Sequence, residues 1–445
     1  MWTRSPAPPE GTLQLPPSSL TTPFTIIDGR LHAERVPLEQ IAEAFGTPTW
    51  VYSRAAIESA FDEFAAACAN RSALICYAIK ANSSLAILEL LARRGAGFDI
   101  VSGGELARVL AAGADPGKVV FSGVGKTVSE MRDALTAGVR CFNVESESEL
   151  VRLNAVAGAM HKLAPVSLRI NPDVDAGTHP YISTGLRENK FGIAHDRALA
   201  AYRMAAALPH LKVMGIDCHI GSQITELAPF LAALERLLEL IDQLTQAGIA
   251  LHHLDLGGGL GITYQDEVPP SRGDTLQALF ARIDAWAQQR GRAVPEVMFE
   301  FGRSMVGNAG LLLTRVEVIK ENGERHFAVV DAAMNDLLRP AMYEAWHDIV
   351  PLQAGKAQAQ TYDVVGPVCE SGDWLGRART LAIEEGDLLA VMSAGAYGMA
   401  MSSNYNTRAR GAEVMVDDDR MHLIRARERV ADLFALERPL PMTPT

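Results

Sequence analysis

The sequence predicts an α/β protein in which a TIM-like (β/α)8 barrel is joined to a mostly antiparallel β domain. From about residue 74, short apolar runs alternate with longer amphipathic segments, which is typical of parallel strands connected by helices. The number of such runs is eight, as a closed barrel requires. After residue 300, strand-like runs follow one another without long helices between them, and this pattern favours an antiparallel sheet.

Helix signals separate the predicted barrel strands. Leucines from Leu85 to Leu91 have helical spacing and end at Gly95, and Ser146 with Glu149 forms the pattern of a capping box. The eight predicted strands are residues 73–79, 97–101, 118–122, 139–144, 166–171, 213–219, 252–256 and 296–300.

Domain boundaries are predicted where the alternation of strand-like and helix-like segments begins and ends. We predict a barrel over residues 46–310 and a discontinuous β domain built from residues 23–45 and 311–445. Strand-like runs between Phe24 and Tyr52 could complete that β domain. The proline-rich residues 1–22 are predicted to be a flexible tail.

Composition excludes several function classes. The chain has 445 residues, 48% of them apolar and 21% charged, as expected for a globular protein of two domains. Its 41 basic and 53 acidic residues give a net charge of −12, which opposes binding to nucleic acid or to an anionic membrane. Five scattered cysteines without a C-x-x-C pair favour a reducing, cytoplasmic location and predict no metal site. No apolar run reaches the roughly 18 residues of a membrane-spanning helix.

Active sites of such barrels form at the carboxyl ends of the strands. Lys80 follows the first predicted strand directly, although an ammonium group is costly to desolvate. It either pairs with a loop carboxylate or forms a Schiff base with an aldehyde. The other polar residues at strand ends are Asp99, Arg169, His219 and Glu300.

Glycines after the seventh strand suggest a phosphate site. Gly257, Gly258, Gly259 and Gly261 stand where barrels commonly bind a phosphate, although a tight turn would also explain them. The segment SGVGKT resembles the end of a phosphate-binding P-loop, but Val120 stands where its first glycine is required. We therefore reject an ATP site there.

A Schiff-base lysine, a phosphate site and a strand-end carboxylate together indicate pyridoxal phosphate, whose protonated ring nitrogen makes it an electron sink. Glu300 is the candidate partner of that nitrogen, or else an ion-pair partner of Arg303. His219 is either a residue that stacks on the ring or a hydrogen-bonded core histidine. We count Asp99 and Arg169 among the cofactor-binding candidates.

Several motifs, in order, resemble the diaminopimelate decarboxylases of the alanine-racemase-like class of pyridoxal-phosphate enzymes. The resemblance runs from about residue 45 to 408 and implies the same two-domain fold. One departure is Phe301, where the family normally has proline. The motifs are YAIKAN, HPYISTGLRENKFGI, CHIGSQ, LDLGGGLGI, EFGRS, LLRPAMYEAWHDI, GPVCESGD and AGAYG.

The resemblance also implies residue roles. Lys80 would carry the aldehyde, His219 would stack on the ring and Glu300 would face its nitrogen. Cys369 would donate a proton, unless it is a small buried packing residue, and the partner subunit of a homodimer would supply it together with Glu370, the ligand of the distal ammonium. The residues implied for the phosphate are Ser222, Gly258, Gly259, Gly302 and, from the neighbouring subunit, Tyr397. Those implied for the distal carboxylate are Arg303, Arg339 and Tyr343. We also count Arg303 among the cofactor contacts and Tyr397 among the substrate contacts.

The implied reaction is decarboxylation of meso-2,6-diaminopimelate at its D-centre, which gives L-lysine and CO2. Alternatives are a decarboxylase of ornithine, arginine or carboxynorspermidine, an amino-acid racemase, and an inactive regulatory protein. Arg303 and Arg339 argue against ornithine, and Glu300 argues against a racemase, because such barrels often place arginine at the ring nitrogen. Lys80 and Cys369, both present, argue against an inactive homologue.

Overall fold

The computed structural model describes residues 23–440, apart from 178, 180, 181, 183, 186, 187, 355 and 356. The predicted tail, residues 1–22, and parts of the motif beginning at His179 therefore lie outside the described residues. The chain divides into two compact units. Ile57–Gly307 forms one, and the segments before and after it together form the other.

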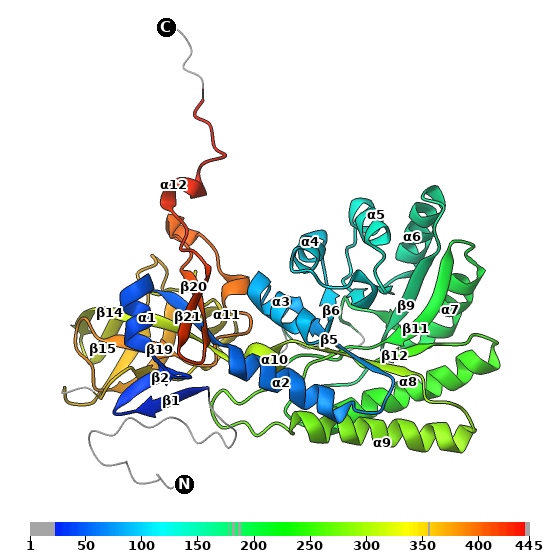
Figure 1. Ribbon diagram of the computed structural model, residues 1–445, viewed down its shortest axis with the longest axis horizontal. Helices are drawn as coiled ribbons and strands as arrows, with labels where there is room; N and C mark the ends of the chain where they lie inside the picture. Colours follow the sequence, from blue (N-terminus) through cyan, green and yellow to red (C-terminus); the bar gives the residue numbers. More distant parts are fainter. Residues whose placement is uncertain are drawn as a thin grey trace. The chain divides into compact units, whose positions relative to one another are not determined.

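The first unit is a closed barrel of eight parallel strands surrounded by helices (Figure 1). The strands follow one another around the barrel in chain order, and β13 pairs with β5 to close it. Its strands are β5 (Ala73–Ala78), β6 (Gly97–Ile100), β7 (Val119–Phe121), β8 (Cys141–Val144), β9 (Ala164–Asn171), β11 (Leu211–Asp217), β12 (His253–Asp255) and β13 (Glu296–Phe301). All eight predicted strands are thus present, and the short β10 (Ile193–Ala194) adds to the edge of β9.

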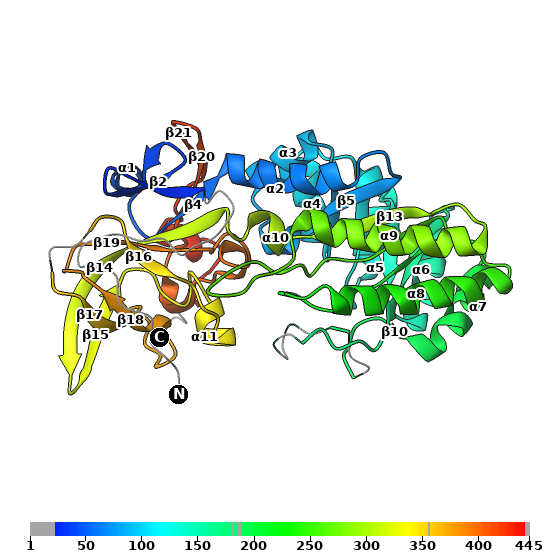
Figure 2. The same cartoon turned by 90° about the horizontal axis from the view of Figure 1, so that it is seen from below.

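Helices cover the outside of the barrel, and α8 and α9 lie side by side along it (Figure 2). Their apolar faces are buried, as their leucine spacing requires. The helices are α2 (Arg54–Ala67), α3 (Leu85–Arg93), α4 (Gly103–Ala111), α5 (Val128–Ala137), α6 (Glu147–Ala159), α7 (Ala198–Ala207), α8 (Ala228–Gln246), α9 (Arg272–Arg290) and α10 (Arg303–Val306). In residues 23–440, the gaps aside, none has the length and apolar character to cross a bilayer.

The predicted capping box at the start of α6 is only half formed. The Ser146 hydroxyl accepts a hydrogen bond from the Glu149 N–H, but the Glu149 carboxylate turns to the buried Lys126 Nζ at 2.8 Å. Because a buried ammonium needs a counter-charge, the Glu149 carboxylate pairs with Lys126 instead of completing the capping box. Lys126, from the rejected P-loop-like segment, is thus a structural residue.

The second unit contains a mostly antiparallel sheet centred on β14 (Gly310–Asn322). Among the strands that the structure describes in this sheet, only the β15–β17 and β4–β20 pairs are parallel. Its other strands are β4 (Thr49–Ser53), β15 (Arg325–Val330), β16 (Ile349–Pro351), β17 (Gln360–Val365), β18 (Trp374–Leu381), β19 (Leu388–Val391), β20 (Ala412–Asp417) and β21 (Arg420–Arg425), with the short helices α11 (Arg339–Tyr343) and α12 (Val430–Leu433).

The N-terminal segment belongs to this second unit. Strands β1 (Phe24–Ile27), β2 (Arg30–Ala33) and β3 (Val36–Pro37) form a small sheet, and helix α1 (Leu38–Phe45) packs with it on a shared apolar core. Strand β4 pairs with β14 and β20. The boundary predicted at residue 46 differs from this arrangement, because β4 pairs with β14 some 260 residues and with β20 some 360 residues further along the chain.

Candidate active site

Lys80 lies in the one-turn helix η1 (Ile79–Ala81), directly after β5. Its Nζ is 2.6 Å from Asp99 Oδ2 on the neighbouring strand β6, so the predicted ion pair with a carboxylate exists. The amine is nevertheless accessible, since a third of the lysine side chain is exposed. The second oxygen of the fully buried Asp99, Oδ1, has no hydrogen-bond partner among the described residues. The ion pair therefore holds the Lys80 side chain at the carboxyl end of the barrel beside Asp99.

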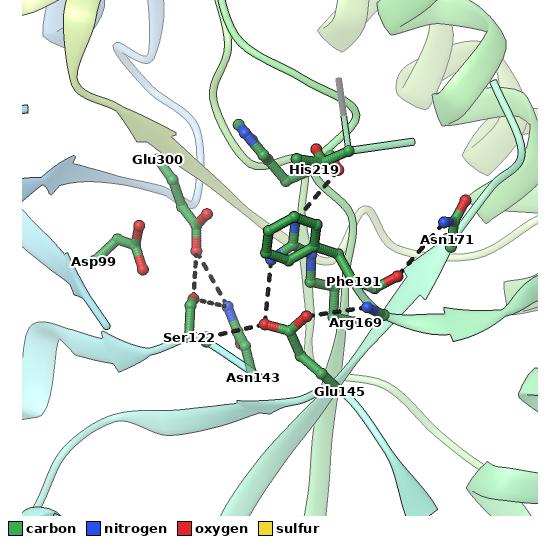
Figure 3. A network of polar contacts seen from close by, with 12 residues as sticks. Asp99, Ser122, Asn143, Glu145, Arg169, Asn171, Phe191, His219 and Glu300 are labelled. Atoms are coloured by element: carbon green, nitrogen blue, oxygen red, sulfur yellow. Dashed lines mark hydrogen bonds and ion pairs between the residues drawn. The ribbon is translucent and has the colours of Figure 1, made fainter. Parts of the chain in front are cut away.

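Glu300 is held inside the barrel at the end of β13. Its main chain pairs with Cys76 of β5, which places Glu300 and Lys80 on adjacent strands. Asn143 Nδ2 and the Ser122 hydroxyl donate to Glu300 Oε1 at 3.1 and 3.4 Å (Figure 3). Phe301, which stands where the family normally has proline, stacks on Phe64 with ring centroids 4.1 Å apart.

Two further buried carboxyl groups lie beside Glu300. Asp217 and Asp255 each place a carboxylate oxygen within 4.8 Å of Glu300 and of one another. Burial and the charges of Asp99 and Asp255 raise the pKa of Glu300 well above its usual range. Burial likewise raises the pKa of Asp217, and it raises the pKa of Asp255 to about 7. This carboxyl cluster therefore retains protons near neutral pH.

The sequence interpretation missed Asp217 and Asp255. Both occupy strand ends, in GIDCH and LDL, so the rule that selected Glu300 applies equally to them. It also missed Ser122 and Asn143, which follow or end strands β7 and β8. For Ser122 and Asn143, in contrast to the two aspartates, no local sequence pattern distinguishes a site residue from an ordinary polar residue of a barrel.

His219 follows β11, and its ring is hydrogen-bonded to the segment of glycines at 257–261, which we call the glycine segment. Its Nδ1 accepts a hydrogen bond from the Gly258 N–H at 3.1 Å. Burial and the positive charges of Arg169 and Lys80 lower the pKa of His219 well below its usual value. The imidazole is therefore neutral, as a ring that stacks on an aromatic cofactor should be.

Gly258 and Gly259 approach neighbouring main chain so closely that no side chain would fit, and Gly302 leaves little room for one. A Cβ atom on Gly258 would lie 2.0 Å from the Glu300 carbonyl oxygen, and one on Gly259, whose φ is +104°, would lie 2.3 Å from that of Gly221. A Cβ on Gly302 would meet the Ala78 carbonyl at 3.0 Å. The glycine segment thus joins the Glu300 strand to the Ser222 loop.

Arg303 lies next to this glycine segment. It is buried, and its guanidinium donates to the Ser222 hydroxyl at 2.9 Å and to the Tyr264 hydroxyl at 2.6 Å. Ser222 and Arg303, both predicted for the site, are therefore brought together. Tyr264 was not predicted.

Arg169 has a structural partner. Its guanidinium bonds to Glu145 Oε1 at 3.2 Å and lies over the ring of Phe191 at 5.0 Å (Figure 3). Glu145 also accepts the N–H groups of Gly123 and Gly192 at 2.9 and 3.0 Å. Arg169 additionally donates to the carbonyl of His219. These contacts tie three loops at the barrel mouth together.

The remaining predicted site residues lie in the second unit. Arg339 is buried and bonded to His347 Nε2 at 2.8 Å. Cys369 is exposed, so the alternative of a buried packing residue is wrong for this chain. Tyr397 has a positive φ of 56°. The other two members of this set are Tyr343, at the end of α11, and the exposed Glu370.

Pyridoxal phosphate fits the barrel residues. An accessible lysine amine lies beside a buried aspartate with an unpartnered oxygen. A carboxyl group that binds protons lies on the adjacent strand, and closely packed glycines adjoin a serine and an arginine. These groups suit an aldehyde, a pyridine nitrogen and a phosphate, respectively.

Comparison with protein-family models identifies the class of enzyme to which the barrel belongs. Residues 54–307 match the family model of the pyridoxal-dependent decarboxylases, described as their pyridoxal binding domain.

The relatives narrow this class. Diaminopimelate decarboxylases of Pseudomonas aeruginosa and Vibrio cholerae are 60% and 59% identical to the chain, covering 94% and 93% of it and 99% and 98% of their own lengths. The crystal structure of diaminopimelate decarboxylase from M. jannaschii in co-complex with L-lysine is 38% identical, with a TM-score of 0.89 over 94% of this chain and 98% of that one. The chain therefore belongs to the diaminopimelate decarboxylase family.

Proposed function

We propose that this chain decarboxylates meso-2,6-diaminopimelate at its D-centre, using pyridoxal phosphate, and releases L-lysine and CO2. The observation that carries the proposal is the placement of Lys80 and Glu300 at the ends of the adjacent strands β5 and β13. The names of the relatives and the L-lysine bound in a related structure support the substrate.

Pyridoxal phosphate, when bound, supplies an electron sink for the electron pair left by the departing CO2. The chain contributes the groups around it. Lys80 binds the aldehyde, and Asp99 holds its ammonium form until then. Glu300 is the partner of the ring nitrogen, and in this buried position its carboxylate would pair with the protonated nitrogen. The neutral His219 covers a ring face, and the phosphate is bound by Gly258, Gly259, Gly302 and Ser222, together with Tyr397 of the partner subunit.

Substrate recognition needs a second set of groups. Arg303, Arg339 and Tyr343 hold the distal carboxylate, for which an arginine fork is well shaped. Glu370 binds the distal ammonium. Cys369 then delivers the proton that replaces CO2.

We infer that the enzyme is a homodimer in which each site takes Cys369 and Glu370 from the partner subunit. The support is the resemblance to the diaminopimelate decarboxylases, which implies that these residues come from the partner subunit. Cys369 and Glu370 are both exposed in the single chain, as residues that reach another subunit must be. A cytoplasmic location is inferred from five cysteines that are all free.

The test is CO2 release from purified protein supplied with pyridoxal phosphate and, separately, meso-diaminopimelate, ornithine or arginine. We expect release from meso-diaminopimelate and formation of L-lysine in equal amount. Release from ornithine or arginine alone would overturn the proposed substrate. Sedimentation analysis, together with activity restored by mixing inactive Lys80→Ala and Cys369→Ala chains, tests the shared site.

A further inference from the structure

Cys369 and Glu370 each contact a residue of one turn in the second unit, the turn Tyr405–Thr407. The Tyr405 hydroxyl donates to Glu370 Oε1 at 2.6 Å. The Cys369 N–H donates to Asn406 Oδ1 at 3.3 Å. Two adjacent residues of the turn thus contact two adjacent residues of the proposed site, in the same chain.

The turn is fixed in an unusual conformation. Asn406 and Thr407 have φ values of 53° and 55°, in the left-handed region, which asparagine tolerates better than most residues. The Asn404 carboxamide bridges it, donating to the Arg408 carbonyl at 3.0 Å and to Glu428 at 2.7 Å. Arg410 in turn donates to Asn404 Oδ1 at 2.8 Å. Such a network limits movement of Tyr405 and Asn406.

The turn and the Cys369 loop are both hydrogen-bonded to the same segment, around Met334 and Asn335. The Asp373 carboxylate accepts the N–H groups of Met334 and Val368 at 2.6 and 2.7 Å. Next to Met334, the Asn335 carbonyl accepts the Ser403 N–H at 2.8 Å. Both Asp373 and Asn335 are almost fully buried. The two surface contacts therefore join loops that are already anchored to one segment.

From this arrangement we propose that Tyr405 and Asn406 are positioning residues for substrate recognition and proton delivery. This inference rests on the proposed function. The Tyr405 hydroxyl occupies one oxygen of Glu370 and directs the carboxylate toward the distal ammonium. Asn406 fixes the main chain that carries the Cys369 thiol.

A double-mutant cycle tests the role of Tyr405. We expect Tyr405→Phe to lower kcat/KM for meso-diaminopimelate by about 5- to 20-fold, mostly through KM. D-2-aminopimelate, which lacks the distal amine, should be used equally well by both proteins. The double variant Tyr405→Phe, Glu370→Ala should be no slower than Glu370→Ala alone. Asn322→Ala, an exposed change at the end of β14, is the control.

Additive effects in the cycle, or an equal loss with both substrates, would overturn the role of Tyr405. Wild-type protein that releases no CO2 from meso-diaminopimelate would instead overturn the proposed function. For Asn406, we expect Asn406→Gly, which tolerates the positive φ, to lower kcat by about tenfold or more, and Asn406→Asp to retain activity. An unchanged kcat in Asn406→Gly would reject that part of the proposal.

Discussion

Replacing Asp255 by asparagine tests the electrostatics of the carboxyl cluster. The pKa of Asp255 is raised from 3.8 to about 7 by burial. A raised pKa means that the folded protein binds the proton more tightly than the unfolded chain does. Its stabilising effect is therefore complete below about pH 4 and is lost as the pH rises to about 7.

The size of this loss follows from the pKa difference. A shift of about 3 units at 1.36 kcal/mol per unit corresponds to about 4 kcal/mol above pH 7. Asparagine is neutral at every pH, and its Oδ1 can still accept the Gly257 N–H that Asp255 accepts at 3.0 Å. At pH 8 we therefore expect Asp255→Asn to raise the melting temperature by roughly 10 °C. At pH 4 the two proteins should differ little.

The assay is thermal unfolding of the cofactor-free chain between pH 4 and 9, with the barrel transition followed by near-ultraviolet circular dichroism. Asp133→Asn, an exposed change on α5, is the matched control and should leave the pH profile unchanged. Parallel profiles for wild type and Asp255→Asn would show that Asp255 is ionised throughout. The physical picture of the carboxyl cluster would then be wrong.

Other substitutions test separate parts of the molecule. Lys80→Ala should abolish the visible absorbance of enzyme-bound pyridoxal phosphate and all CO2 release; a variant that keeps both would refute the assignment. Cys369→Ala should retain the cofactor and lose about 10²- to 10⁴-fold in kcat, and an unchanged rate would show that another group delivers the proton. Lys126→Ala leaves Glu149 buried without its ion-pair partner and should destabilise the barrel by about 3–5 kcal/mol in denaturant titrations. Phe301→Ala should cost a similar 3–5 kcal/mol through its lost stacking on Phe64, and a neutral effect would argue against that packing.

The order of strands in the barrel could be predicted because each strand is a local feature. Eight apolar runs separated by amphipathic segments leave few ways to satisfy the backbone except a closed parallel sheet. The same logic placed Lys80, His219 and Glu300 at strand ends, where the structure has them. The family relationship was readable from motifs for the same reason, since each motif is a short continuous segment.

The contacts between distant segments could not be predicted. Glu300 meets Asn143 across 157 residues and Ser122 across 178. Tyr405 meets Glu370 across 35 residues, and β4 meets β14 across far more. Nothing in the local sequence around these residues specifies the partner.

The sequence by itself thus determined the class of fold, the family and the chemical type of the reactive groups, because residue type and periodicity act over a few residues. The tertiary structure decided which carboxyl groups lie close enough to raise one another's pKa, which lysine is buried and which is partly exposed, and which turn contacts Cys369. Those properties depend on burial and on distances between charges, and folding sets both only when separate segments pack together.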